Sequence, residues 1–267
     1  MKHIQTFESF INEIEYGNQL FGDTSGSEFD ISKAYARYLK LIKGKQEKNT
    51  PDEEEIFKSI IGYIRDADYD KQIGDKLKKL LPLKKKFPLL LDPLADPFVE
   101  DFGFLWRGAT METSELVKYV ENAGLDWSKE NKDWYVSVDI NSTINSRSER
   151  GALSFTMNKS IASDFVRSDK KTTLSINDLD KRYPIIIQAK ISAIKDKLIL
   201  APSFLEAIGE WFEVETLYLD SKIPCEKIIV PPPSFFSKLR NVLMKGDSGV
   251  DKLPTNLQKF IKVTNYL

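Results

Sequence analysis

Two glutamates, Glu213 and Glu215, stand two positions apart in the alternating stretch 212–219. Period-two alternation predicts a strand, so both carboxylates point to one face, at the solvated end of a strand that runs into a core. Carboxylates held this close repel each other when both are charged. Such a pair suits a reaction that develops positive charge, or one that takes a proton from a very weak acid. Two ordinary surface acids at a strand end are the alternative interpretation.

The rest of the composition limits which other chemistries are available. The 267-residue chain has Lys+Arg 39 against Asp+Glu 40 and a sequence pI of about 6.1, so no global charge favours nucleic-acid binding. His3 is the only histidine, which excludes a histidine-based core triad or metal site. Cys225 is the only cysteine, which excludes an intramolecular disulfide and indicates a reducing compartment. We therefore expect catalysis without a metal, by carboxylates, hydroxyls, Arg or Lys.

The chain divides into three parts by composition. Residues 1–16 have the apolar spacing of a short helix and are followed by a Gly- and Ser-rich stretch. Residues 17–98 carry further helical patterns and end in the proline-rich segment 88–97, so they are expected to form a helical lobe. Residues 99–267 change to strand patterns and are expected to form the remaining domain.

Short strands dominate the last part of the chain. We expect strands at 102–107, 134–140, 152–156, 183–191, 197–200, 212–219 and 227–230, and helices at 113–122, 158–166 and 234–245, with polar loops at 141–150 and 167–180. Thr113 is the expected cap of the first of these helices, and Gly124 its stop. Neither a Walker motif nor GxGxxG is present. The predicted class is α+β, a helical lobe followed by a mostly antiparallel β-rich core.

Three predicted strands carry a pattern that resembles a known family. The pattern consists, in order, of Leu105-Trp106-Arg107-Gly108, then Ser154-Phe155-Thr156 followed by a helix with Ala162 and Phe165, and then Glu213-Val214-Glu215. It is similar to the mono-ADP-ribosyltransferases of the arginine–serine–glutamate class, and the resemblance covers roughly residues 102–230. Phe155 and Thr156 depart from the commonest Ser-Thr-Ser, and the stretch between Arg107 and Ser154 is long.

The resemblance implies roles in binding the co-substrate NAD. Arg107 would hold the phosphates or the nicotinamide-side ribose, because a guanidinium fork matches phosphate oxygens. Gly108, which has no Cβ, would let the backbone approach the nicotinamide amide. Ser154 would orient Glu215 by a hydrogen bond, and Thr156 would support the strand. Each of these residues also has an ordinary structural interpretation, such as a surface ion pair or a plain strand hydroxyl.

The two glutamates would carry the chemistry. Glu215 would stabilise the oxocarbenium-like ribosyl centre that remains when nicotinamide leaves. Glu213 would bind and help to deprotonate the guanidinium of an acceptor arginine, which is otherwise always charged. Activity towards arginine of a host protein follows from a first Glu in this motif. NAD hydrolysis, or transfer to a nucleobase or RNA end, is the alternative reaction at the same site.

Further residues would surround the co-substrate and the protein acceptor. The resemblance places Phe165 and Arg167 where the family has a loop closing over the nicotinamide phosphate; core packing is the expected alternative for Phe165. Trp211 and Phe212 would lie in the turn that recognises the protein substrate. Trp211 is the expected contact, whereas Phe212 shares its face with Val214 and favours the core.

The first residues of the chain carry a second resemblance. The segment KHIQTFESFINE is similar to targeting peptides of proteins packaged in the heads of T-even-like phages, and Ile11-Asn12-Glu13 fits the cleavage context of their maturation protease. This implies a virion interior or host bacterial cytoplasm, a host protein as partner, no membrane, and nucleic acid only through that target. A non-enzymatic internal head protein, with chance motifs, is the alternative class.

Overall fold

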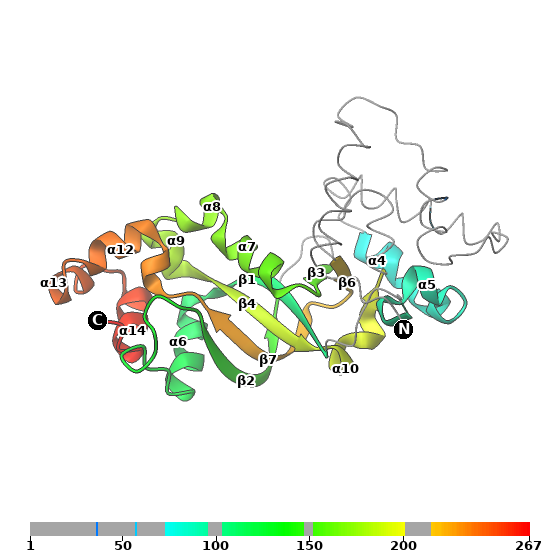
Figure 1. Cartoon of the computed structure of the whole chain (residues 1–267), viewed down its shortest axis with the longest axis horizontal. Helices are drawn as coiled ribbons and strands as arrows, with labels where there is room; N and C mark the ends of the chain where they lie inside the picture. Colours follow the sequence, from blue (N-terminus) through cyan, green and yellow to red (C-terminus); the bar gives the residue numbers. More distant parts are fainter. Residues whose placement is uncertain (1–35, 37–56, 58–72, 96–102, 147–151, 201–214) are drawn as a thin grey trace, which may run out of the picture.

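A computed structural model describes residues 36, 57, 73–95, 103–146, 152–200 and 215–267 of the chain. The described part combines helices with one antiparallel sheet of seven strands, which confirms the predicted α+β class (Figure 1). None of its helices has the length and hydrophobicity that a bilayer crossing needs. Most of the expected helical lobe, 17–98, lies outside the described residues.

The strands are β1 (Phe104–Glu112), β2 (Val136–Asn145), β3 (Leu153–Thr156), β4 (Arg182–Lys190), β5 (Leu198–Ile199), β6 (Glu215–Tyr218) and β7 (Lys222–Val230). The helices are α4 (Ile73–Lys78), α5 (Pro88–Leu91), α6 (Thr113–Asn122), α7 (Lys159–Arg167), α8 (Asp169–Thr172), α9 (Ile176–Lys181), α10 (Ile191–Ile194), α12 (Ser237–Leu243), α13 (Asp247–Val250) and α14 (Thr255–Val263). Short 3-10 turns are η1 (Leu81–Lys85), η2 (Pro93–Ala95), η3 (Lys195–Lys197) and η4 (Pro233–Phe235).

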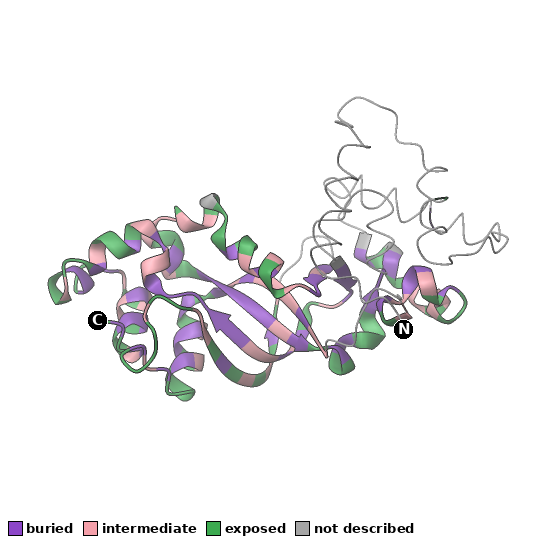
Figure 2. Cartoon of the chain, in the orientation of Figure 1, coloured by how far each residue is buried: buried purple, intermediate pink, exposed green. Residues whose placement is uncertain are grey.

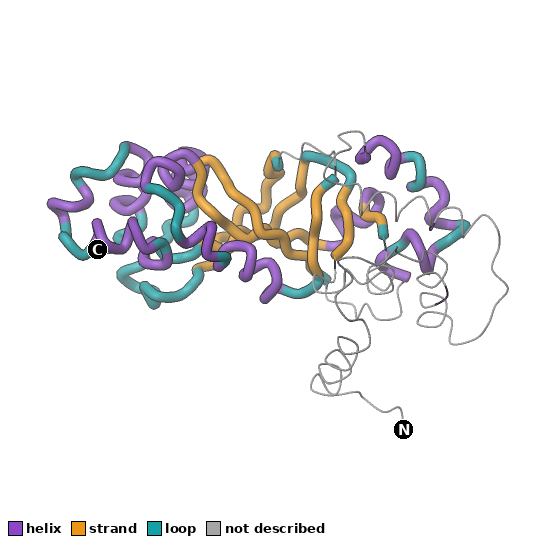
Figure 3. The backbone as a smooth tube through the Cα atoms, turned by 90° about the horizontal axis from the view of Figure 1, so that it is seen from above, coloured by secondary structure: helices purple, strands orange, loops and turns teal. Residues whose placement is uncertain are grey.

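The sheet has the order β2-β7-β4-β1-β3-β6-β5. It has the fewest paired positions between β1 and β3, near its middle. Strands β1 and β4 pair over nine positions, from Phe104↔Lys190 to Glu112↔Arg182. Strands β1 and β3 pair in register only at Trp106↔Thr156. The sheet therefore consists of a long part, β2-β7-β4-β1, and a short part, β3-β6-β5, joined at one position. Viewed from above, the strands occupy the centre and helices gather at both ends (Figure 3).

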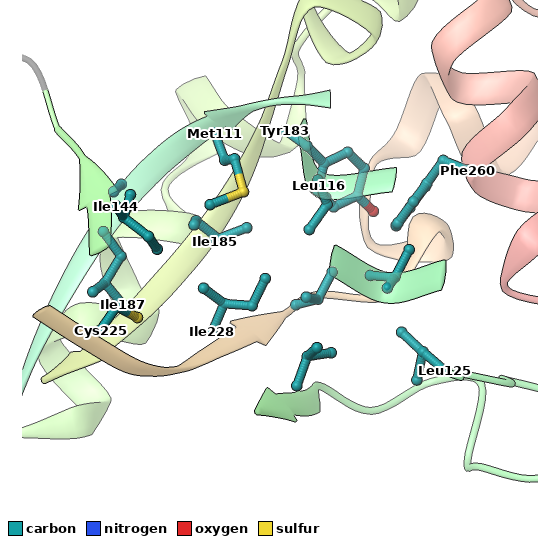
Figure 4. Packing of buried hydrophobic residues seen from close by; sticks show 14 of the residues in the cluster. Met111, Leu116, Leu125, Ile144, Tyr183, Ile185, Ile187, Cys225, Ile228 and Phe260 are labelled. Atoms are coloured by element: carbon teal, nitrogen blue, oxygen red, sulfur yellow. The ribbon is translucent and has the colours of Figure 1, made fainter. Parts of the chain in front are cut away.

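One face of the sheet covers the main hydrophobic core. Alternate residues of β4 are fully buried there, and Ile185 and Ile187 pack with Met111 of β1 and Ile228 of β7 (Figure 4). Helices α6 and α14 close this core, where the buried Tyr183 ring lies 4.8 Å from that of Phe260. Figure 2 shows the central strands as mostly buried. Burial of this aliphatic surface is the main force that fixes the sheet.

The opposite face of the sheet is covered by α7. Ala162 and Val166 of this helix pack on Ile186 of β4 and Ile229 of β7. The helix begins where expected, because the Asn158 side chain caps it by accepting a hydrogen bond from the Ser160 N–H at 2.9 Å. The packing of this helix therefore fixes the distance between α7 and β1, the strand on which Arg107 and Gly108 lie.

Three long strands differ from the sequence prediction, and the first is β1, which runs to Glu112 where it was expected to end at Arg107. β2 continues through Asn145, where a polar loop was expected, and β7 starts at Lys222 rather than Lys227. These two additions pair with each other from Ser142↔Cys225 to Asn145↔Lys222, beyond a bulge after Asp139. The pattern is weak because β2 is an edge strand with polar outward residues, and its bulge breaks the alternation.

Helix boundaries differ at two further places. Gly124, with φ +66, follows the end of α6 as predicted, but Thr113 does not cap that helix. Its hydroxyl is buried and donates instead to the carbonyl oxygen of Leu179 at 2.5 Å. The expected loop 167–180 contains α8 and α9, and α9 opens with a capping box formed by Ser175 and Asp178.

Candidate active site

Arg107 ties the two parts of the sheet together. Its guanidinium Nη1 donates a hydrogen bond to the backbone carbonyl oxygen of Ser154 at 2.7 Å, across the junction between β1 and β3. The side chain is half-buried there. A charge-assisted bond of this length is among the stronger polar contacts in a protein. It stabilises the junction beside the one position, Trp106↔Thr156, at which the two strands pair in register.

The three predicted motif strands are neighbours in the sheet. Arg107 lies on β1, Ser154 on β3 and Glu215 on β6, and the strand order places β1, β3 and β6 side by side. Arg107 and Glu215, the outer two, are more than a hundred residues apart in the sequence. The backbone positions of these residues are therefore brought together, as the resemblance implies.

The register between β3 and β6 decides which hydroxyl faces which position. Thr156 pairs with Glu215, and Ser154 pairs with Leu217. Thr156, not Ser154, is thus the direct cross-strand neighbour of the Glu215 backbone, and Ser154 is the diagonal one. Thr156 is buried, and its Oγ1 accepts a hydrogen bond from the Asn158 N–H at 3.0 Å, which joins the strand to the start of α7.

One row of residues crosses six strands through this register. From one edge it contains Asp139, Lys227, Gln188, Trp106, Thr156 and Glu215. Arg107 follows Trp106 by one residue, so it belongs to the next row and to the face of Leu105 and Ala109. The strand pleat thus places Arg107 on the opposite face from Ser154 and Thr156, whereas the resemblance implies that Arg107, Ser154 and Glu215 line one cleft; the Glu215 side chain itself lies outside the described atoms. A ligand that contacted residues of both rows would have to pass between β1 and β3 at their junction.

Gly108 is fixed by helix packing. A Cβ added at this position would lie 2.4 Å from Phe165 Cδ1 and 2.5 Å from Phe165 Cβ, so a side chain here would push α7 off the strand. Phe165 occupies the space next to Gly108 in which the nicotinamide amide was expected. Phe165 itself is 43% exposed, so it is only partly the core residue that was the alternative expectation.

The remaining predicted residues divide between α7 and a stretch that is not described. Arg167 stands exposed in the last turn of α7. Glu213, Trp211 and Phe212 lie outside the described residues, as does Glu210. Their expected roles therefore stay predictions.

Three further residues had no predicted role of their own. Trp106 was only part of the motif, yet its buried indole N–H has no hydrogen-bond partner and it shares the row of Thr156. Lys171 was expected in the polar loop 167–180, and Arg182 lay just before the strand expected at 183–191. The adjacent basic pairs Lys170-Lys171 and Lys181-Arg182 were the available signal.

Three further features concern the chemistry that the described residues offer. None of their His, Cys, Asp and Glu side chains forms a group of three or more suited to hold a metal ion. A hollow of about 630 Å³ includes none of the candidate residues; it is lined by Ser128, Asp247, Val250, Asp251, Ile261, Lys262, Asn265, Tyr266 and Leu267. Burial raises the pKa of the Cys225 thiol to about 12, so this thiol is not a nucleophile in the folded chain.

No protein-family model, curated protein or solved structure matches this chain.

Proposed function

We propose that the chain is a mono-ADP-ribosyltransferase that moves ADP-ribose from NAD to an arginine of a host protein. The observation that carries the proposal is the hydrogen bond from Arg107 to the Ser154 carbonyl, at the junction of two neighbouring strands. The strand order supports the proposal, because the strands that carry Arg107, Ser154 and Glu215 are neighbours in the sheet. Scattered motif matches in a structural protein would not need neighbouring strands.

The reaction assigns one event to each group. The glycosidic C–N bond of NAD breaks, and nicotinamide leaves with its electron pair. The carboxylate of Glu215 opposes the positive charge that develops on the ribose. The acceptor guanidinium then attacks the anomeric carbon and gives up one proton, which Glu213 accepts. The products are ADP-ribosylarginine, nicotinamide and a proton.

The test is incubation of the full chain with labelled NAD and a bacterial lysate, followed by a gel and a nicotinamide assay. We expect label on a host protein, and a loss of at least about a hundredfold in both readouts for Glu215→Gln. Glu130→Gln, an exposed residue in the loop before β2, is the matched control. Nicotinamide release without protein labelling would favour NAD hydrolysis, and no release at all would refute the proposal.

A further inference from the structure

Two cations from other elements, Arg182 of β4 and Lys171 of α8, lie near the far end of strand β1. Arg182 begins β4 opposite Glu112, the last residue of β1. Its guanidinium turns to Thr110, where Nε donates to Oγ1 at 3.0 Å and Nη2 donates to the carbonyl oxygen at 3.1 Å. These two bonds fix the guanidinium and leave the rest of its N–H fork for another acceptor.

The second cation reaches the same place from helix α8. The Lys171 ammonium lies 4.6 Å from the centroid of the Phe165 ring. That ring packs on Gly108, two residues before Thr110 on the same face of β1. Lys171 is thus tied to β1 through Phe165 on Gly108, and Arg182 is tied to it through Thr110, two residues further along the same face. Burial, and after it the positive charge of Arg182, lowers the pKa of Lys171.

No carboxylate of the described residues balances this charge. None of their ion pairs within 4.0 Å includes Lys171 or Arg182. Glu112 stands opposite Arg182 in register without pairing with it. Asp178 is bound in the cap of α9, and Asp180 accepts hydrogen bonds from Leu257 and Asn256.

We propose that Lys171 and Arg182 form a binding site for a phosphate group. Two fixed cations that lack a counter-ion are stabilised by a bound oxyanion, and an Arg fork matches phosphate oxygens. The site is separate from the Trp106–Thr156 row, because Thr110 is four residues further along β1, about 13 Å at roughly 3.3 Å per residue. Phe165 of α7 packs on Gly108, which lies between Trp106 and Thr110 along β1. The proposal does not rest on the proposed transferase activity.

The experiment uses the full chain and inorganic phosphate at constant ionic strength, with calorimetry and the phosphate-dependent rise in Tm as readouts. We expect Lys171→Gln and Arg182→Gln each to weaken phosphate binding by at least about tenfold. Lys170→Gln removes the same charge from the exposed neighbour on α8 and is expected to change the affinity by less than about twofold. Lys171→Gln touches neither bond to Thr110, so it tests the site even if Arg182→Gln disturbs the strands.

The outcomes are distinct. Unsaturable phosphate binding by the wild type, or equal losses in the Lys170 and Lys171 variants, would overturn the site. Displacement of phosphate by NAD would assign the site to the phosphates of the dinucleotide, and retention beside NAD would assign it to a separate phosphorylated ligand. Glu215→Gln is expected to keep phosphate affinity, so a failed transferase assay leaves this test intact.

Discussion

At the residue scale, the two glutamates of the motif are expected to differ in what they do. Glu213→Gln removes the base that takes the proton from the acceptor, but it leaves the group that opposes the ribosyl cation. NAD hydrolysis should therefore stay within about threefold of the wild type, while transfer to arginine falls by about a hundredfold. Parallel assays of nicotinamide release and of label on protein measure both rates. An equal loss of both activities would contradict the division of roles.

Arg107 allows a test that needs no turnover. Arg107→Lys keeps the charge but loses the planar fork, so the bond to Ser154 and any contact with phosphate weaken together. In a Glu215→Gln background, we expect the calorimetric Kd for NAD to rise about tenfold. Arg240→Lys, exposed on α12, is the control. An unchanged Kd would remove Arg107 from NAD binding and leave it the structural role that the hydrogen bond already gives it.

At the scale of elements, the contact between α7 and β1 depends on the absence of a side chain at one position. Gly108→Ala places a methyl group within 2.5 Å of both the ring and the Cβ of Phe165, so rotation of the ring alone cannot relieve the clash. We expect a loss of about 1–3 kcal/mol in the free energy of unfolding, measured by denaturant titration.

A double-mutant cycle isolates this contact. In a Phe165→Ala background the ring is gone and only the Cβ remains, so Gly108→Ala should cost less there than in the wild type. Equal costs in the two backgrounds would mean that Phe165 does not set the spacing between helix and strand.

The helices and strands also show how much of the fold could be predicted from the sequence. The long apolar run of β4 was predicted to within one residue at each end, since burial on both sides leaves a clear pattern. The end of β1 was missed by five residues, because its second half is only partly buried and has no clear alternation of apolar and polar residues. The second half of β2 was missed because an edge strand keeps polar residues and its bulge, with Asn141 at φ +41, interrupts the period. Helix α14 was left unassigned although Leu257, Phe260 and Ile261 have helical spacing.

The geometry of the candidate site could be predicted from the sequence less well than the strands that form it. The order of the motifs predicted which strands meet, and the bond from Arg107 to a backbone carbonyl depends only on that adjacency. The register that sets Thr156 opposite Glu215 could not be predicted, because it depends on how β3 and β6 align over four residues. The proximity of Lys171 to Arg182 could not be predicted either, because it depends on where α8 lies over the sheet.

At the scale of the whole molecule, Cys225 reports on global unfolding. It is the only cysteine, and its thiol is 3% exposed in the core and donates to the Lys227 carbonyl oxygen at 3.0 Å. Its pKa is about 12 in the fold against an ordinary value of 9.0, so above about pH 9 the unfolded chain loses this proton first. Stability should therefore fall as the pH rises from 9 towards 12.

The measurement is the free energy of unfolding by denaturant at pH 8, 9 and 10 for the wild type and Cys225→Ala. The variant is expected to be less stable at pH 8 because it leaves a small cavity, and to lose less between pH 9 and 10. Identical slopes in the two proteins would exclude the thiol as the cause. Alkylation of the wild-type thiol should proceed only at the rate of unfolding.

The single paired position between β1 and β3 has a consequence for where the sheet opens first. Nine paired positions hold β1 to β4, whereas one pair and the Arg107 bond hold it to β3. Amide protons of β1 that face β4 are then expected to exchange with solvent late, and those that face β3 early. The strand is stiff along one edge and compliant along the other, and the compliant edge is the one that faces Ser154.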